Sequence, residues 1–261
     1  MISMDNENSL YDRFLEIVKM RTSVRRFKPD PLPEGTVEKI LEAGRWAMSG
    51  ANSQPWEFIV VRNPQVKKSL WKAYLDIIAA YTFWMEQLRV DDLRHPAFQI
   101  PGTADEQWDY YKGKDPKGWS VASVLIVVLG DGRRQWGTVM GAHTFGRGMT
   151  HLAEGLANCC QVMHLAAATL GLGTQWVTIP IQEPFKRILD IPDLLTLHTI
   201  IPVGFPAIPR KKTGRRPLAE ITHDESYDGA KYLSDREIVE YLRKLRRQTM
   251  HSYPGSKKKE R

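Results

Sequence analysis

The stretch VASVLIVVLGD, residues 121–131, decides the fold class of this chain. It is almost continuously apolar and rich in β-branched residues, without the alternation of a strand that is wetted on one side. Such a run is typical of a strand that is covered on both faces. The sequence on either side of it must therefore supply the elements that cover it.

Helical periodicity marks several segments around this strand. We expect helices over residues 10–20, from the turn at 31–33 to about 50, over 64–89, over 145–170, before the last strand, and over 235–248. Asn63 is expected to cap the helix that begins at residue 64. Residues 145–170 are apolar or small nearly all round, which predicts a helix that is buried on every side, with a second subunit as one candidate neighbour.

Three more strands are expected, in the stretches WEFIVVRN (56–63), TQWVTI (174–179) and LHTIIPVGF (197–205). Mixed strands and helices around one core predict a single α+β domain. We divide the chain into a domain over residues 1–233 and a C-terminal helix with a basic tail over 234–261. The domain contains an aromatic-rich insertion at 75–119, which favours either a lid over a ligand or aromatic packing onto the body.

Composition excludes several protein classes. The chain has 261 residues, of which 42% are hydrophobic and 26% charged, as in ordinary globular proteins. We expect no membrane span and no secretory signal. We also expect no metal site, because the only cysteines are adjacent and the histidines share no ligand spacing. His164 is expected to be a core or interface side chain, and Cys159 and Cys160 inert apolar residues. The predicted compartment is the cytoplasm.

Most of the net charge of +7 lies at the C-terminal end. Residues 240–261 hold eight Lys or Arg and two Glu, and so account for six of the seven positive charges. A charged tail of this kind is typically solvated. Because the body of the chain is then nearly neutral, we expect no nucleic-acid partner.

Four stretches carry the polar groups of a candidate site: RTSVRRF (21–27), MSGANSQPWEFIVV (48–61), LGLGTQWVTIP (170–180) and GRRPL (214–218). Singly, each has an ordinary structural explanation as a helix end, a capping turn or a solvent loop. In this combination and order they resemble the FMN-dependent nitroreductase superfamily. The SGANSQPW version at 49–56 is most similar to its iodotyrosine deiodinase-like branch, and the resemblance covers residues 10 to about 223.

The resemblance implies both a fold and an assembly. The fold is a three-layer sandwich with a central, mostly antiparallel sheet flanked by helices, and residues 1–233 would be the FMN-binding domain. The assembly is a homodimer with an extended interface, in which the flavin site lies between the two chains.

The resemblance also assigns the flavin contacts. A doubly charged phosphate is held best by arginine and hydroxyl donors, and those donors are implied to be Arg21, Thr22, Ser23 and Arg25, completed by Arg215 or Arg216. Arg215, two positions before the proline, matches the family better. Residues implied to cover the flavin from the other subunit are Ser49, Gly50 and Asn52, with Gln54 as a further contact. Residues implied to follow the edge of the ring are Gln175, Trp176, Val177 and Thr178, of which Thr178 alone offers a hydroxyl toward N5.

The implied activity is a ping-pong oxidoreductase reaction that uses FMN. NAD(P)H delivers hydride to flavin N5 and leaves, and a small aromatic, nitro or quinone-like acceptor takes its place. The flavin carries the chemistry, so no side chain is expected to act as a catalyst. Three alternatives stay open: reductive dehalogenation, fragmentation of the flavin, and a flavin-binding protein without turnover.

Overall fold

A computed structural model describes residues 4–87, 117–134, 148–209 and 214–250. The chain divides into two compact units, Met1–Ile77 with Lys114–Arg210 and Ile78–Gly113 with Lys211–Arg261. The first unit contains the sheet and is described first. The division at residues 233 and 234 that we expect from the sequence stays a prediction.

The sheet has four antiparallel strands in the order β1-β2-β4-β3. These strands are β1 (Trp56–Val61), β2 (Val124–Asp131), β4 (Leu195–Gly204) and β3 (Gly173–Thr174). β2 pairs with β1 on one side and β4 on the other, and all eight of its residues are buried. The prediction of a strand covered on both faces is confirmed.

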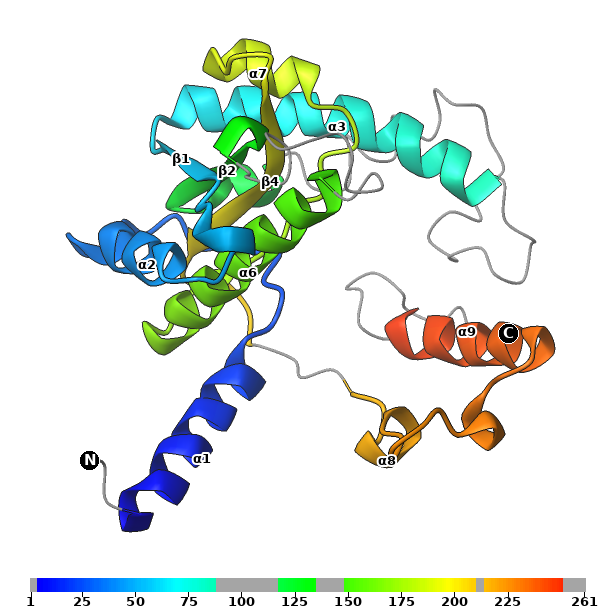
Figure 1. Cartoon of the computed structure of the whole chain (residues 1–261). Coiled ribbons are helices and arrows are strands. Elements are labelled where there is room, and N and C mark those ends of the chain that lie inside the picture. Colours follow the sequence, from blue (N-terminus) through cyan, green and yellow to red (C-terminus); the bar gives the residue numbers. More distant parts are fainter. Residues whose placement is uncertain (1–3, 88–116, 135–147, 210–213, 251–261) are drawn as a thin grey trace. The chain divides into compact units, whose positions relative to one another are not determined.

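Helices cover both faces of the sheet, which gives three layers (Figure 1). Alternate residues of β2, such as Ile126 and Val128, pack in a cluster with α2 (Thr36–Arg45) and α6 (Gly148–Thr169). The residues between them join Leu70 of α3 (Pro64–Gln87) and Phe185 of α7 (Glu183–Leu189) in a second cluster. This arrangement confirms the predicted sandwich, because a strand presents successive side chains to opposite faces.

The remaining helices precede or follow these layers. They are α1 (Met4–Met20) in the first unit, α8 (Leu218–Ile221) and α9 (Asp235–Met250) in the second, and short 3₁₀ turns at Gly50–Asn52, Gly118–Val121, Gly132–Arg134 and Gly229–Lys231. The Asn63 cap is confirmed, since its Oδ1 accepts the Gln65 N–H at 2.8 Å. α9 also starts with a cap, in which the Ser234 hydroxyl accepts the Glu237 N–H at 3.4 Å and the Glu237 carboxylate accepts the Ser234 N–H at 2.8 Å.

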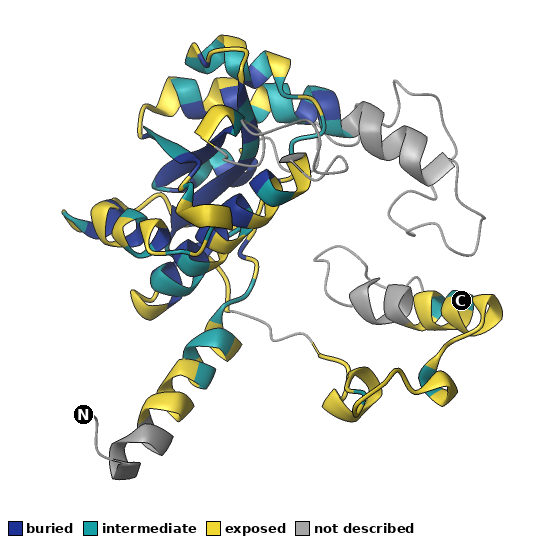
Figure 2. Cartoon of the chain, in the orientation of Figure 1, coloured by how far each residue is buried: buried dark blue, intermediate teal, exposed yellow. Residues whose placement is uncertain are grey.

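One face of α6 is exposed in the single chain, as Figure 2 shows. Leu156 and Cys160 are fully buried against the sheet, whereas Met149 is 65% exposed and Glu154 and Asn158 are also exposed. The prediction of a helix buried on every side is therefore wrong for one chain. The sheet and α2 cover only the face that is turned toward them.

The predicted strand at 174–179 is shorter than expected. Its ladder with β4 includes only Gly173 and Thr174, and the same register returns as a single bridge between Val177 and Ile200. β4 has a bulge just past this bridge, because Val128 pairs with Thr199 and Leu129 with Leu197, which leaves His198 without a partner on β2. A bulge increases the local twist and disrupts regular pairing beside it.

The insertion is described only at its two ends. Tyr74 stacks on Trp71 at 5.5 Å between ring centroids and lies 5.6 Å from Trp119, which is 2% exposed. At this end the aromatic residues pack onto the body. Residues 88–116, which hold four of the eight aromatic residues of the expected lid, lie outside the described residues.

Candidate functional site

The loop of residues 21–25, called the 21–25 loop below, directly follows α1. The Val24 side chain is 6% exposed, and its N–H donates to the Thr174 carbonyl of β3 at 2.8 Å. Ser23 also forms a parallel bridge with Thr174. The loop backbone is thus fixed to the sheet, while its predicted phosphate donors are half-buried (Arg21, Thr22) or exposed (Ser23, Arg25).

The close approach of this loop to β3 depends on Gly173. A Cβ at Gly173 would lie 2.6 Å from Cγ2 and 2.7 Å from Cβ of Val24, far inside the roughly 3.5–4.0 Å at which carbon atoms pack. The sequence LGLG at 170–173 therefore does more than end α6. Gly171 ends the helix with a φ of 75°, and Gly173 admits the loop.

A buried histidine lies behind the same strand. His164 Nδ1 is 2.8 Å from Thr174 Oγ1, and the two residues are 5% and 4% exposed. Burial, and next the positive charge of Arg21, lower the pKa of His164 to about 4, so the imidazole is neutral at pH 7. The prediction that His164 is a core side chain is confirmed. His164 links α6 to the strand that anchors the 21–25 loop.

Residues 175–178, the 175–178 segment, continue from β3. The Val177 side chain is 1% exposed, its N–H donates to the Ile200 carbonyl at 3.1 Å, and its carbonyl accepts the Thr199 hydroxyl at 2.8 Å. Val177 is thus the anchor of the segment, with its backbone groups bonded within the sheet. The exposed side chains lie on either side of it, at Trp176 and Thr178, and Gln175 is half-buried.

Trp176 packs between two histidines. Its ring meets that of His198 edge-on, with centroids 5.1 Å apart and an interplanar angle of 79°, and His164 lies at 6.3 Å. Burial lowers the pKa of His198 as well. His198 Nε2 is buried without a hydrogen-bond partner among the residues that the structure describes. Trp176, 39% exposed, therefore presents one part of its indole to solvent and the rest to two imidazoles.

The loop of residues 49–54, called the 49–54 loop, has an unusual backbone. Ala51, Asn52 and Gln54 have φ values of 51°, 52° and 45°, in the left-handed region that non-glycine residues seldom adopt. The Ser49 hydroxyl accepts the Gln54 N–H at 3.0 Å and closes the loop. Three such residues in four positions mark a segment whose shape is set by its surroundings, a feature that concentrates at binding sites. Gly50, Asn52 and Gln54 are exposed.

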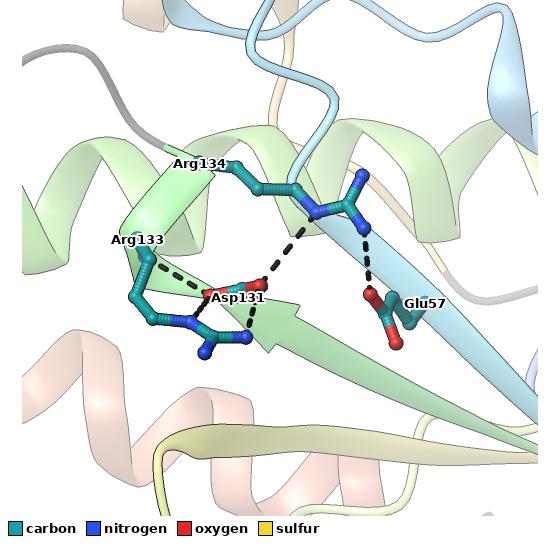
Figure 3. A network of polar contacts seen from close by, with 4 residues as sticks. All are labelled: Glu57, Asp131, Arg133 and Arg134. Carbon is teal, nitrogen blue, oxygen red and sulfur yellow. Dashed lines mark hydrogen bonds and ion pairs between the residues drawn. The ribbon is translucent and has the colours of Figure 1, made fainter.

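A network of charged side chains lies on the residues that follow this loop and on the strand that pairs with them (Figure 3). The Asp131 N–H donates to the Pro55 carbonyl at 2.8 Å, and the buried Asp131 carboxylate accepts two bonds from Arg133 at 2.8 Å. Arg134 reaches Asp131 at 3.6 Å and Glu57 at 3.0 Å. The hydrogen bonds from Arg133 lower the pKa of Asp131 despite its burial. The network joins β1, β2 and the end of the 49–54 loop.

The 49–54 loop and the 21–25 loop lie next to different parts of α6. Ser49 lies against Gly155, where an added Cβ would be 3.3 Å from the Ser49 Cβ. His164, which bonds to Thr174 next to the 21–25 loop, comes nine residues after Gly155, about 13 Å further along the helix axis. The structure thus brings the 21–25 loop together with the 175–178 segment, and holds the 49–54 loop separately.

The two predicted C-terminal arginines belong to the second unit, which is described by itself. Arg215 donates to the Gly214 carbonyl at 3.0 Å. Arg216 pairs with Glu220 one turn later, at 3.7 Å between Nε and Oε2. The choice between Arg215 and Arg216 stays a prediction. None of the helices in the described ranges is both long and apolar enough to cross a membrane.

The structure adds residues that the sequence patterns do not single out. Thr174 lies within the 170–180 stretch and His198 within the last predicted strand, but nothing in the spacing of the residues shows that they contact His164 and Trp176. Asp131 left a weak signal, an acidic residue that closes an apolar strand and precedes two arginines. The pairing of His164 with Thr174 depends on the angle between α6 and β3, which a sequence does not display.

The chain matches the model of a known protein family over most of its length. The model of the nitroreductase family matches residues 18–205, which contain three of the four polar stretches. The chain belongs to the nitroreductase family. The match ends before Arg215 and Arg216, so these two residues are not covered by it.

Relatives within the nitroreductase family have different names. An NADH dehydrogenase of Thermus thermophilus is 24% identical over 77% of this chain and 90% of its own length. An iodotyrosine deiodinase of Drosophila melanogaster is 27% identical over 74% of this chain and 62% of its own. A crystal structure of an iodotyrosine deiodinase bound to FMN and 3-iodo-L-tyrosine superimposes with a TM-score of 0.60 at 21% identity, over 82% of this chain and all of that one. These matches support an oxidoreductase in the broad sense.

Proposed function

We propose that this chain is an FMN-dependent oxidoreductase that takes electrons from NADH or NADPH and passes them to a small aromatic, nitro or quinone-like acceptor. One observation carries the proposal: the 21–25 loop, dense in cationic and hydroxyl donors, is fixed to the strand that leads into the 175–178 segment. In this proposal the phosphate site and the site of the ring edge therefore adjoin within one chain. A cytoplasmic location is part of the same proposal.

The residues present fit the phosphate of FMN. Arg21 and Arg25 supply positive charge, and the hydroxyls of Thr22 and Ser23 supply donors that suit the oxygens of a phosphate. Val24 anchors the loop by its buried side chain and its bond to Thr174, so these groups are held together on one short backbone. Either Arg215 or Arg216 completes the set in this proposal.

The 175–178 segment would adjoin the ring. When bound, FMN supplies the redox chemistry by taking up and passing on hydride equivalents. The chain itself contributes the Thr178 hydroxyl and the exposed edge of Trp176, which the Val177 anchor holds in place. These groups orient the ring and stabilise negative charge on it, and no side chain is assigned a proton transfer.

We include a homodimer in the proposal, because the single chain leaves apolar surface next to the 49–54 loop. Trp46 is 75% and Met48 77% exposed, and on α1 Leu10 and Phe14 are 55% and 53% exposed. Exposed apolar side chains of this size are typical of surfaces that a partner covers. In a dimer, the 49–54 loop of one chain would cover the flavin that the 21–25 loop of the other chain holds.

Reduction without oxygen tests the function. We expect the purified protein to carry flavin absorbance and either NADH or NADPH to bleach it anaerobically, with the colour returning when a quinone or nitroaromatic compound is added. Protein that takes up FMN but is bleached by neither nicotinamide would contradict the proposed donor. That result would favour the alternative of a flavin-binding protein without turnover.

Reductive dehalogenation is the second candidate, favoured by the superposition on the deiodinase structure and by the related deiodinase sequence. The measurement is halide release from 3-iodo-L-tyrosine by the anaerobically reduced protein. Release that is no faster than with free reduced FMN would exclude it. Rapid release, together with slow turnover of quinones, would replace the first candidate by the second.

A further inference from the structure

The buried hydrogen bond between His164 and Thr174 connects three parts of the molecule. Thr174 pairs with Val203 of β4, forms a bridge with Ser23, and accepts the Val24 N–H at its carbonyl. Its hydroxyl meets His164 Nδ1 of α6 at 2.8 Å. One threonine thus joins α6, the sheet and the 21–25 loop.

Filling the space between α6 and β3 with a buried imidazole costs free energy. An imidazole that is 5% exposed has lost most of its contact with water, and burying a polar group is unfavourable unless it is hydrogen-bonded. An apolar side chain would pack there without that cost, as Met163 and Ala167 do on the same helix. The hydrogen bond instead gives a defined direction to the Thr174 side chain, and with it to the strand.

We propose that His164 is a positioning residue: through its hydrogen bond to Thr174 it fixes the backbone of the 21–25 loop in the shape that receives a phosphate. This role rests on the FMN binding proposed above. His164 itself touches neither the cofactor nor the substrate in this account. It acts through Thr174 on the bridge to Ser23 and on the bond from Val24.

The neutral state of the imidazole suits this position. Arg21 lies near enough for its charge to disfavour a proton on His164, as the lowered pKa of about 4 reflects. A cation at His164 would repel Arg21, which the phosphate site needs nearby. The neutral ring keeps a directional bond to Thr174 without adding a charge under the loop.

Two pairs of variants separate the hydrogen bond from the packing. Thr174→Val keeps the shape of the side chain and removes the hydroxyl, whereas Thr174→Ser keeps the hydroxyl. His164→Leu removes the bonding atom, whereas His164→Asn keeps a polar atom close to the position of Nδ1. Each conservative variant is the matched control of its partner, and the melting temperature of each apo-protein shows that it folds.

The measurement is the dissociation constant for FMN and for riboflavin, which differ only in the phosphate. We expect Thr174→Val and His164→Leu to weaken FMN binding about tenfold, the effect of one buried hydrogen bond. Riboflavin binding should change less than about twofold, within ordinary variation for a site left intact. Thr174→Ser and His164→Asn should recover most of the FMN affinity. Thr199→Val, which removes the hydrogen bond to the Val177 carbonyl, should weaken the binding of both ligands by the same factor.

A double-mutant cycle on the dissociation constant for FMN gives a second test of this role. If His164 acts through the loop, the double variant Thr174→Val with Arg25→Ala should weaken FMN binding by less than the product of the two factors measured for the single variants. For Thr174→Val combined with Thr178→Ala, the two factors should multiply, because Thr178 belongs to the proposed ring edge.

Three results would overturn the role of His164. They are unchanged FMN affinity in Thr174→Val and His164→Leu, equal losses for FMN and riboflavin, and no recovery in the conservative variants. If wild-type protein binds no FMN at all, the proposed function fails as well, so the two failures are distinguishable.

Discussion

Single buried polar residues hold the two polar loops of this chain to its sheet. His164 bonds the side chain of Thr174, whose carbonyl accepts the Val24 N–H of the 21–25 loop, and the Asp131 N–H bonds the Pro55 carbonyl at the end of the 49–54 loop. Each is bonded to a defined partner, as buried polar groups must be to offset the loss of water. The exposed donors of the two loops are therefore held by residues that do not face the ligand.

His164 should make stability depend on pH. Its pKa is about 4 in the folded chain against an ordinary value of 6.5, so between these values the folded state binds fewer protons than the unfolded state. The stability that His164 contributes is complete above pH 6.5 and is lost as the pH falls toward 4. Between pH 6.5 and 4.5 we expect a loss of roughly 2–3 kcal/mol from this residue.

Urea unfolding of the apo-protein at pH 6.5 and 4.5 measures this loss. In His164→Asn the fall in the free energy of unfolding should be smaller than in wild type by that amount. His198, whose pKa is also lowered by burial, remains in both proteins and adds the same fall to each. Parallel curves for the two proteins would show that His164 takes up its proton in the folded state as easily as in the unfolded chain.

At the scale of elements, α2 and α6 approach each other closely at Gly44. A Cβ at Gly44 of α2 would lie 2.5 Å from Met163 Cγ and 3.2 Å from Cys159 Sγ of α6. Met163 and Cys159 are fully buried, and burial raises the pKa of the Cys159 thiol to about 12, so it stays protonated. The two helices can approach only because Gly44 has no side chain.

Gly44→Ala should therefore destabilise the protein. Overpacking of a full core costs about 1–3 kcal/mol, and the better helix propensity of alanine returns at most about 1 kcal/mol. We expect a net loss of roughly 1–2 kcal/mol in urea unfolding. Gly229→Ala, where an added Cβ meets nothing within 4 Å, is the control and should change stability by less than about 0.5 kcal/mol. A stabilised Gly44→Ala would mean that Met163 moves aside freely.

The elements of the core were predictable where one physical signal dominates. The apolar run of β2 and the Asn63 cap both follow from local chemistry, and both are confirmed. The strand at 174–179 was expected too long, because β-propensity does not reveal the bulge at His198 on the strand it pairs with. The exposed face of α6 was missed because small and apolar residues do not show which side a neighbour covers.

The residues of the site were predictable only in part, for a related reason. The 21–25 loop is visible in the sequence because its donors are adjacent. Thr174, His198 and Asp131 act through contacts between separate elements, and neither propensity nor spacing encodes such contacts. The roles of the predicted flavin contacts stay proposals that the structure makes specific.

For the whole molecule, the central claim is that the first unit seats FMN by its phosphate. The sheet places the 21–25 loop beside the 175–178 segment, and the exposed 49–54 loop is left for the second chain of the proposed dimer. In the proposed dimer the site would be complete only in the assembly, with the phosphate end held by each chain on its own. Such a division would explain why the polar groups of the 49–54 loop lie apart from those of the 21–25 loop.

The most direct test is a titration of the apo-protein with FMN, followed by the quenching of flavin fluorescence, for wild type, Arg21→Ala and Arg26→Ala. Arg26 is the matched control, an exposed arginine of the same stretch that lies outside the predicted contacts and whose carbonyl accepts the Ala207 N–H. We predict one FMN per chain, affinity within about threefold of wild type for Arg26→Ala, and a loss of roughly ten- to a hundredfold for Arg21→Ala. Wild-type affinity in Arg21→Ala, or no binding of FMN by wild type, would contradict the account.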